Sequence, residues 1–232
     1  MKGAFITGTD TGVGKTRVAT ALVDALARDG LQVAAMKPIA AGAVRTPDGL
    51  RNEDALALMQ AANVPAAYDL VNPYCAELAA SPHIALAKVG IVADLAKIRR
   101  AAERLGEEAD LVIVEGAGGW QAPITDGLTM ADVALALELP VVLVVGLRLG
   151  CLNHALLTAE AIELSGLHFA GWVGNHLQPH FEHASENITT LERRLRAPLL
   201  DVVAHGAQAF ALRAAIDAAR SALDASRASN AP

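Results

Sequence analysis

A glycine-rich segment close to the N-terminus is the first part of this sequence whose residue types and spacing suit chemistry. Residues 8–16 read Gly-Thr-Asp-Thr-Gly-Val-Gly-Lys-Thr, between an apolar run and a helical pattern. Such a turn presents backbone N–H groups and the positive end of a helix dipole to a bound anion. Lys15 adds a charge for the β- and γ-phosphates of a nucleotide, and the Thr16 hydroxyl is placed to ligate Mg²⁺. The segment predicts a phosphate-binding loop, although five residues rather than the usual four separate Gly8 from Gly14.

A second segment joins an apolar strand to a carboxylate. Leu111–Val114 is followed by Glu115 and then by the small residues Gly116, Ala117 and Gly118. In nucleotide-binding sheets, an acidic group at such a strand end meets the metal ion or its waters. Glu115 alone is compatible with a solvated charge, but beside a phosphate loop it predicts a metal ligand.

Two charged residues between these segments are candidates for the same site. Lys37 follows the second apolar run and precedes Pro38, so we expect its side chain at the same edge of the sheet, holding either a transferring phosphoryl group or the carboxylate that attacks it. Asp54 stands at the head of a helical stretch. The pattern leaves open whether Asp54 complements the helix dipole or ligates Mg²⁺.

Two later strand ends offer further ligand contacts. Residues 150–153, Gly-Cys-Leu-Asn, begin a helix without a Lys-Thr pair, and this helix start is suited to a substrate carboxylate. Asn175 ends another strand, and its carboxamide offers both a donor and an acceptor. Asn175 therefore either reads an adenine edge or caps the segment that follows.

The histidines and cysteines give weaker signals. His176, His180 and His183 lie close together but have no acidic or cysteine partner pattern, which disfavours a metal site. Cys75 and Cys151 are far apart and are expected to be free thiols.

These residues need a scaffold of strands and helices that alternate along the chain. Strand-length apolar runs recur at Gly3–Thr7, Gln32–Met36, Leu111–Val114, Val141–Val145, Phe169–Val173 and Leu199–Val203. Helical spacing recurs at Arg17–Ala27, Glu53–Ala61, Leu95–Leu105, Met130–Leu137, His154–Leu164, Ile188–Leu195 and Ala209–Leu223. The alternation predicts an α/β fold of the P-loop NTPase type, with a mostly parallel sheet covered by helices on both faces. We expect one domain over residues 1–225 and a frayed tail over 226–232.

Composition limits the partners. The net charge is −6 and the pI is about 5.6, which disfavours nucleic acid and anionic membranes as partners because both need a basic surface. The longest apolar run, Leu139–Leu147, is about half of a membrane span. We expect a soluble cytoplasmic protein with small-molecule partners.

Seven blocks, taken in order, resemble the dethiobiotin synthetases of biotin synthesis. They are the phosphate loop, Met36-Lys37-Pro38-Ile39-Ala40-x-Gly42, Val71-Asn72-Pro73-Tyr74, Ser81-Pro82-His83, Val114-Glu115-Gly116-Ala117-Gly118-Gly119-Trp120, Gly150-Cys151-x-Asn153-His154-Ala155 and Gly171-Trp172-Val173-x-Asn175. The resemblance implies an ATP- and Mg²⁺-dependent ligase. Such a ligase inserts CO₂ between the two amines of 7,8-diaminopelargonic acid, through a carbamate and a carbamic-phosphoric anhydride.

The resemblance also implies a role for each matching position. Thr16, Asp54 and Glu115 would hold Mg²⁺, and Lys15 and Lys37 would act in catalysis together with Thr11. Nucleotide contacts would come from Gly12, Val13, Gly14, Lys15, Thr16, Arg17, Asp54, Glu115, Gly116, Ala117, Gly118, Asn175 and His176. Substrate contacts would come from Thr11, Lys37, Ala41, Gly150, Cys151, Leu152 and Asn153, the last four from the neighbouring subunit of a homodimer.

Three departures from the family pattern stand out. Gly12 replaces a residue that is often Glu, and Ala41 replaces a small hydroxyl residue. Asp201–Ala204 replaces a Gly-x-x-Pro loop that would form part of the base-binding wall. These departures bear on substrate affinity and on the preference for ATP.

Two other functions are compatible with a phosphate loop. Switch ATPases of the chromosome-partition type carry an additional lysine early in that loop, where this chain has Thr9-Asp10-Thr11. A regulator without catalysis would explain Gly12 and Ala41 but not the retained Lys15 and Lys37. The sequence therefore favours the ligase.

Overall fold

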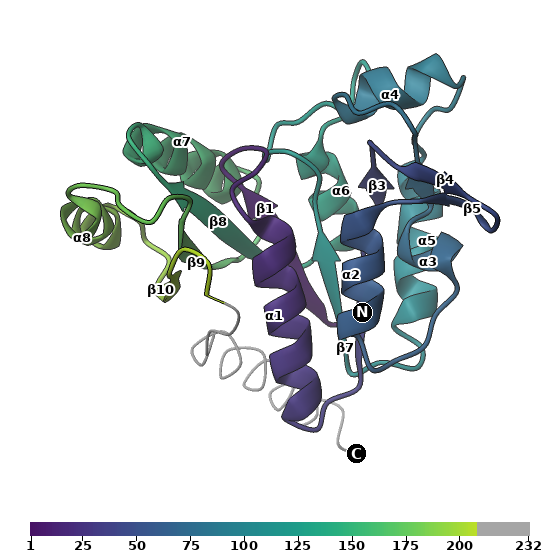
Figure 1. The fold of residues 1–232 in the computed structure, drawn as a ribbon, viewed down its shortest axis with the longest axis horizontal. Coiled ribbons are helices and arrows are strands. Elements are labelled where there is room, and N and C mark those ends of the chain that lie inside the picture. Colours follow the sequence, from purple (N-terminus) through teal and green to yellow (C-terminus); the bar gives the residue numbers. More distant parts are fainter. Residues whose placement is uncertain (208–232) are drawn as a thin grey trace.

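A computed structural model of the chain describes residues 1–207, which form a six-stranded sheet flanked by helices (Figure 1). All its neighbouring strands pair in parallel. The strands are β1 (Gly3–Gly8), β2 (Val33–Met36), β7 (Leu111–Glu115), β8 (Val141–Leu147), β9 (Phe169–His176) and β10 (Leu199–Val203). Their order across the sheet is β10-β9-β8-β1-β7-β2.

This order places β1 where the winding of the sheet reverses. The chain runs outward from β1 to β2, returns to β7 between them, and then crosses to β8 on the other side of β1. In open parallel sheets, ligands bind outside the carboxyl ends of the strands at such a switch point. The loop that follows β1 is the glycine-rich segment 8–14, so the topology puts the predicted phosphate loop at this point.

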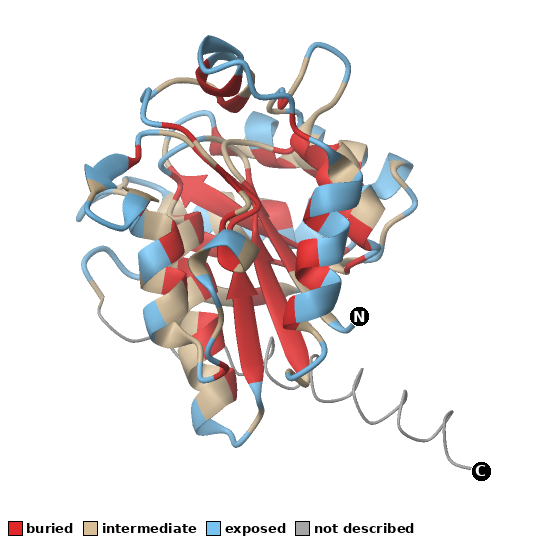
Figure 2. Cartoon of the chain, turned by 90° about the vertical axis from the view of Figure 1, so that its right-hand side faces the viewer, coloured by how far each residue is buried: buried red, intermediate tan, exposed pale blue. Residues whose placement is uncertain are grey.

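Helices cover both faces of the sheet, as predicted. They are α1 (Lys15–Arg28), α2 (Glu53–Ala61), α3 (Tyr68–Val71), α4 (Pro82–Lys88), α5 (Leu95–Leu105), α6 (Met130–Leu137), α7 (Cys151–Leu164) and α8 (Ala184–Arg194). The buried residues of α1 pack with Ile6, Ile113 and Val144 on one face. Those of α5, α6 and α7 pack on the other face. In Figure 2 the central strands of the sheet are buried and the helices turn exposed residues outward.

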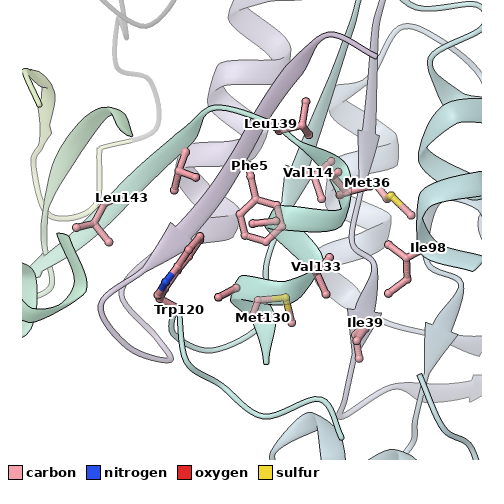
Figure 3. Packing of buried hydrophobic residues seen from close by; sticks show 14 of the residues in the cluster. Phe5, Met36, Ile39, Ile98, Val114, Trp120, Met130, Val133, Leu139 and Leu143 are labelled. Carbon is pink, nitrogen blue, oxygen red and sulfur yellow. The ribbon is translucent and has the colours of Figure 1, made fainter. Parts of the chain in front are cut away.

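Phe5 and Trp120 form the aromatic centre of the second face. Their rings meet edge to face with centroids 6.4 Å apart (Figure 3). A Cβ at Gly116 would approach Phe5 and Met130 at 3.1 Å. The turn after β7 therefore lies close against this core, and packing fixes the direction in which Glu115 leaves its strand.

Residues 38–94, between Lys37 and α5, fold over the carboxyl edge of the sheet, and we call this segment the wall. It contains the short strands β3 (Ile39–Ala40), β4 (Val44–Thr46), β5 (Gly49–Arg51) and β6 (Tyr74–Cys75), with β3 paired to β6 and β4 to β5. In Figure 1, β3, β4 and α4 lie at the end of the molecule to which the loop after β1 points. The sequence did not predict β3–β6, α3 or α4, because strands of two or three residues and helices of four or seven residues are too short to show a readable period.

The predicted elements that fall within residues 1–207 are confirmed, with differences at their ends. The helix expected at His154–Leu164 begins at Cys151, because Gly150 adopts a left-handed conformation (φ 93°) from which the helix starts directly. Strand β9 continues three residues beyond the expected Val173. The helix expected at Ala209–Leu223 and the domain end at residue 225 lie outside the described residues. No helix in the described range is long and apolar enough to cross a membrane.

Candidate active site

A cleft of about 770 Å³ opens at the carboxyl edge of the sheet. One side is the phosphate loop, and the floor is formed by Lys37 and Glu115 at the ends of β2 and β7. The other side consists of residues from the wall, including Asn52, Asp54 and the segment 79–82. The structure thus brings together the candidates from the phosphate loop, β2, α2 and β7, which are up to about a hundred residues apart in sequence.

The phosphate loop is built on glycines in left-handed conformations. Gly12 has φ 74° and Gly14 has φ 95°, a region that other residues enter only with strain. Gly14 precedes the first residue of α1, so the helix N-terminus points its free N–H groups into the cleft. The Lys15 ammonium donates to the carbonyl of Asp10 at 3.0 Å. Open space surrounds the position of a Cβ at Gly12.

Lys37 joins the two carboxylates on the floor of the cleft. Its Nζ lies 2.7 Å from Glu115 Oε1 and 2.9 Å from Asp54 Oδ2. The Thr16 hydroxyl contacts the same carboxylates, at 2.7 Å from Asp54 Oδ1 and 2.9 Å from Glu115 Oε1. Thr16, Lys37, Asp54 and Glu115 therefore form one cluster, in which Lys37 and Glu115 are almost fully buried.

Burial and the neighbouring charges shift the pKa values of the groups in this cluster. Burial lowers the pKa of Lys15 to about 8, and the nearby positive charge of Lys37 acts in the same direction. Burial also opposes the charge of Lys37, but Glu115 and Asp54 hold the pKa of Lys37 above its ordinary value. Burial raises the pKa of Glu115 against the pull of Lys37. At Asp54 burial alone would raise the pKa, but the nearby Lys37 ammonium outweighs this effect and keeps the pKa of the carboxyl low.

Asn52, rather than Asp54, caps α2. The Asn52 carboxamide oxygen accepts from the backbone N–H groups of Asp54 and Ala55, at 3.1 and 3.2 Å. The Asp54 side chain is then free to turn into the cleft, where it contacts Thr16 and Lys37. Asp54 also lies in the first turn of α2, where its charge complements the helix dipole, and its role as a metal ligand stays a prediction.

The oxygens in the cluster fit a hard divalent cation. One hydroxyl and two carboxylates converge from α1, α2 and β7, and oxygen ligands of this kind suit Mg²⁺. Glu115 Oε2 is buried without a hydrogen-bond partner among residues 1–207. Burial of a carboxylate oxygen without a hydrogen-bond partner is energetically unfavourable, and a cation bound to this oxygen would supply the missing contact.

Asn175 lies against the phosphate loop. Its Nδ2 donates to the carbonyl of Val13 at 2.8 Å, and its Oδ1 accepts from Arg17 at 3.4 Å. A Cβ at Gly14 would lie 2.2 Å from Asn175 Nδ2, so the close approach requires glycine. Arg17 also donates to the carbonyl of Ala204, just after β10. Asn175 therefore holds the loop in place, and its contact with a nucleotide base stays a prediction.

Of the remaining candidates, Thr11, Ala41, Ala117 and Gly118 line this cleft, and others lie outside it. Within the described residues, Gly150, Cys151, Leu152 and Asn153 do not line it. His176 ends β9, and His183 contacts Glu186 at 3.1 Å. No cluster of three or more His, Cys, Asp or Glu side chains suited to a metal occurs in residues 1–207.

Several residues that shape the site escaped the sequence analysis. Arg148 pairs with Asp10 of the phosphate loop at 2.7 Å. Against some desolvation, the backbone N–H of Thr11 and the guanidinium of Arg148 hold the pKa of Asp10 below its usual range. Asn52 carried a readable signal, because an asparagine before a helical pattern is a typical N-cap.

Comparison with known proteins places the chain among characterised families. A family model described as an AAA domain matches residues 2–207. ATP-dependent dethiobiotin synthetases from Xanthomonas oryzae pv. oryzae and Aromatoleum aromaticum are each 50% identical to the chain, over 194 and 205 residues. These alignments cover 84% and 88% of this chain, and 87% and 91% of the relatives.

Solved structures agree on the fold. MinD cell division protein from Aquifex aeolicus superposes with a TM-score of 0.58 at 18% identity, over 97% of this chain and 98% of that one. MinD from Pyrococcus horikoshii, complexed with Mg-ADP, gives 0.55 at 16% identity, over 96% of each chain. At such low identity the likeness shows the fold alone. Half of the aligned residues are shared with the synthetases over more than four fifths of the sequence, and the chain therefore belongs to the AAA domain family and, within it, to the ATP-dependent dethiobiotin synthetases.

Proposed function

We propose that this chain converts 7,8-diaminopelargonic acid, CO₂ and ATP to dethiobiotin, ADP and phosphate. The observation that carries the proposal is the Lys37 ammonium, buried at the floor of the cleft between Asp54 and Glu115 and across from the phosphate loop. A cation at this position faces the place where an anionic nucleophile would meet a γ-phosphate. The membership of the family supplies the substrate class.

The reaction divides into three steps with defined bonds. One amine nitrogen attacks CO₂ and loses a proton, which gives a carbamate. A carbamate oxygen attacks the γ-phosphorus, and the bond from that phosphorus to ADP breaks. The second amine attacks the carbamoyl carbon, phosphate leaves, and the ureido ring closes.

The residues of the cleft offer hydrogen-bond donors and positive charges for the phosphates and the carbamate in these steps. The N–H groups at the start of α1 and the Lys15 ammonium bind the phosphates. Lys37 and Thr11 hold the carbamate, and the Lys37 charge offsets the negative charge that develops during phosphoryl transfer. Thr16, Asp54 and Glu115 would hold Mg²⁺, which would supply charge neutralisation at the nucleotide phosphates.

The start of α7 completes the proposal. Its N–H groups are suited to the substrate carboxylate, and in the described part of the chain residues 150–153 lie outside the cleft. We therefore place this contact across the interface of a homodimer, which is expected to work in the cytoplasm.

The test is ADP release by the purified protein with Mg²⁺ and ATP, with and without diaminopelargonic acid and bicarbonate. Release that requires both additions, with dethiobiotin formed in equal amount, is the expected result. Lys37→Ala should retain ATP binding and lose turnover by about 10²–10³-fold, the usual effect of removing a charge-stabilising group. Slow hydrolysis that ignores both additions would instead support a switch ATPase or a regulator.

A further inference from the structure

The backbone of Lys37 is clamped by the end of α3. Its N–H donates to the carbonyl of Val71 at 2.8 Å, and its carbonyl accepts from the Asn72 side chain at 2.6 Å. Asn72 is buried and also donates to the carbonyl of Tyr74 at 3.1 Å. Because Lys37 lies just beyond the end of β2, these contacts hold the backbone from which its side chain reaches Glu115 and Asp54.

Asn52 similarly holds the backbone of two other residues that line the cleft, Ala41 and Asp54. Its Oδ1 accepts from the N–H groups of Asp54 and Ala55, and its Nδ2 donates to the carbonyl of Ala41 at 3.3 Å. Asn52 is 5% exposed. The start of α2, which carries Asp54, is thereby tied to Ala41, the residue directly after strand β3.

Tyr68 connects these two asparagines. Its hydroxyl accepts from the backbone N–H of Asn52 at 2.7 Å and donates to Asn72 Oδ1 at 3.0 Å. The Arg51 guanidinium lies over the ring, 4.2 Å from its centroid. Burial, the largest influence, raises the pKa of Tyr68 to about 12, so the hydroxyl keeps its proton and remains a donor.

We propose that Tyr68 is a positioning residue, whose hydroxyl joins Asn52 and Asn72 into one network that sets Lys37 and Asp54 at their working distance. The network lies within the wall and does not include the phosphate loop. This inference rests on the proposed function, since it concerns the geometry of the phosphoryl-transfer step. Its loss should therefore affect catalysis more than ATP binding.

The second tyrosine of the chain provides a matched control. The Tyr74 hydroxyl also accepts a backbone N–H, that of Asp94 at 2.9 Å, and its ring also carries a cation, Lys97, at 4.5 Å. Asp94 caps α5 and lies away from the cleft. Tyr→Phe thus removes the same kind of hydrogen bond at both positions, and only the Tyr68 hydroxyl belongs to the network. Tyr74 contacts Asn72 through its backbone carbonyl, which Tyr→Phe leaves in place.

The experiment compares Tyr68→Phe and Tyr74→Phe with the unaltered protein, below the melting temperature of all three. We expect Tyr68→Phe to lower kcat about tenfold or more, because the loss of the hydroxyl leaves the Asn52 N–H and Asn72 Oδ1 unpaired and allows Lys37 and Asp54 to shift. The Kd for ATP should stay within about twofold. Tyr74→Phe should lower the melting temperature with kcat nearly unchanged.

The outcomes separate this proposal from the proposed function. An unaltered protein that makes no dethiobiotin overturns the function itself. An active protein in which the two Tyr→Phe variants have the same kcat overturns the role of Tyr68. A loss of ATP affinity as large as the loss of kcat also overturns it, because a general structural fault would weaken both.

A second pair of variants covers the case in which Tyr68→Phe fails to fold. Asn52→Ala removes the cap of α2 and the contact with Ala41, whereas Asn52→Ser restores an acceptor for the Asp54 N–H. We expect kcat to fall with Ala and to recover partly with Ser. Equal kcat values in the two variants would show that the cap does not position Asp54, and would overturn the network.

Discussion

The starts of α1 and α7 share one backbone geometry but differ in what surrounds them. Gly14 and Gly150 precede the two helices with φ 95° and 93°, and in the described structure neither cap makes a side-chain hydrogen bond. Each helix follows a strand of the parallel sheet. Yet the first residue of α1 is Lys15, which lines the cleft, whereas the first residue of α7 is Cys151, a buried thiol outside it.

The difference comes from the strands that precede the helices. Strand β1 lies at the switch point, between β7 and β8, so Glu115 and the wall face the start of α1. Strand β8 lies between β1 and β9, and the residue before Gly150, Leu149, is 93% exposed. A free helix N-terminus is thus a common backbone feature, and the sheet order and the first side chains decide which one becomes a nucleotide site.

Removal of the side chain at the first helical position should show the largest contrast. Lys15→Ala deletes a charge-assisted contact with the phosphates, worth about 1.5–3 kcal/mol, so the Kd for ATP should rise roughly 10- to 100-fold and turnover should fall at least as far. The matched Cys151→Ala should leave the Kd unchanged and lower stability by about 1 kcal/mol. Calorimetric titration with ATP measures both. Equal Kd changes would contradict the distinction between the two helix starts.

The glycines themselves give the next contrast. Gly14→Ala adds a Cβ that would lie 2.2 Å from Asn175 Nδ2, in addition to its strained φ. Gly150→Ala has the same strain but nothing within 4 Å. We expect Gly14→Ala to weaken ATP binding tenfold or more, by displacement of the loop, at a stability cost of roughly 1–3 kcal/mol.

Gly150→Ala is the control for this experiment. It should cost only about 1 kcal/mol of stability and leave the Kd for ATP unchanged. If the start of α7 binds the substrate carboxylate of the partner site, the KM for the diamine should rise in this variant alone. A Gly14→Ala variant with unaltered ATP affinity would show that Asn175 does not hold the loop.

The sequence predicted the sheet and the part of the site that depends on local patterns. The phosphate loop, Glu115 and Lys37 each follow an apolar run, and the rule that ligands gather at strand ends was sufficient to bring them together. In the structure the Thr16 hydroxyl contacts both Asp54 and Glu115, and their role as metal ligands stays a prediction.

The wall could not be predicted in the same way. Its strands have two or three residues each, and its hydrogen bonds link positions such as Asn52 and Tyr68 whose types suit many roles. The contact of Asn72 with the Lys37 carbonyl joins residues 35 positions apart through the end of a four-residue helix. No local pattern encodes such a pairing, because it depends on how the segment folds over the sheet edge.

The Arg148–Asp10 ion pair connects the segment before α7 to the phosphate loop before α1, and its removal should have the smallest effect. The two side chains are 42% and 48% exposed, and ion pairs at such sites contribute about 1 kcal/mol or less. Asp10 retains its hydrogen bond to the Thr11 N–H, and its carbonyl still accepts from Lys15. Arg148→Gln should therefore raise the KM for ATP by about fivefold at most, with kcat little changed.

A change of ionic strength and a matched variant distinguish this small effect from a non-specific one. Because the pair is exposed, the difference between Arg148→Gln and the unaltered protein should shrink as ionic strength rises. Arg99→Gln is the control, since Arg99 pairs with Glu103 on α5 at 2.9 Å with similar exposure, away from the cleft. If the two variants have the same KM for ATP, the two helix starts are not coupled through Asp10. If Arg148→Gln instead lowers kcat by orders of magnitude, the guanidinium touches a reacting group, and the division between a nucleotide-binding α1 and a separate α7 no longer holds.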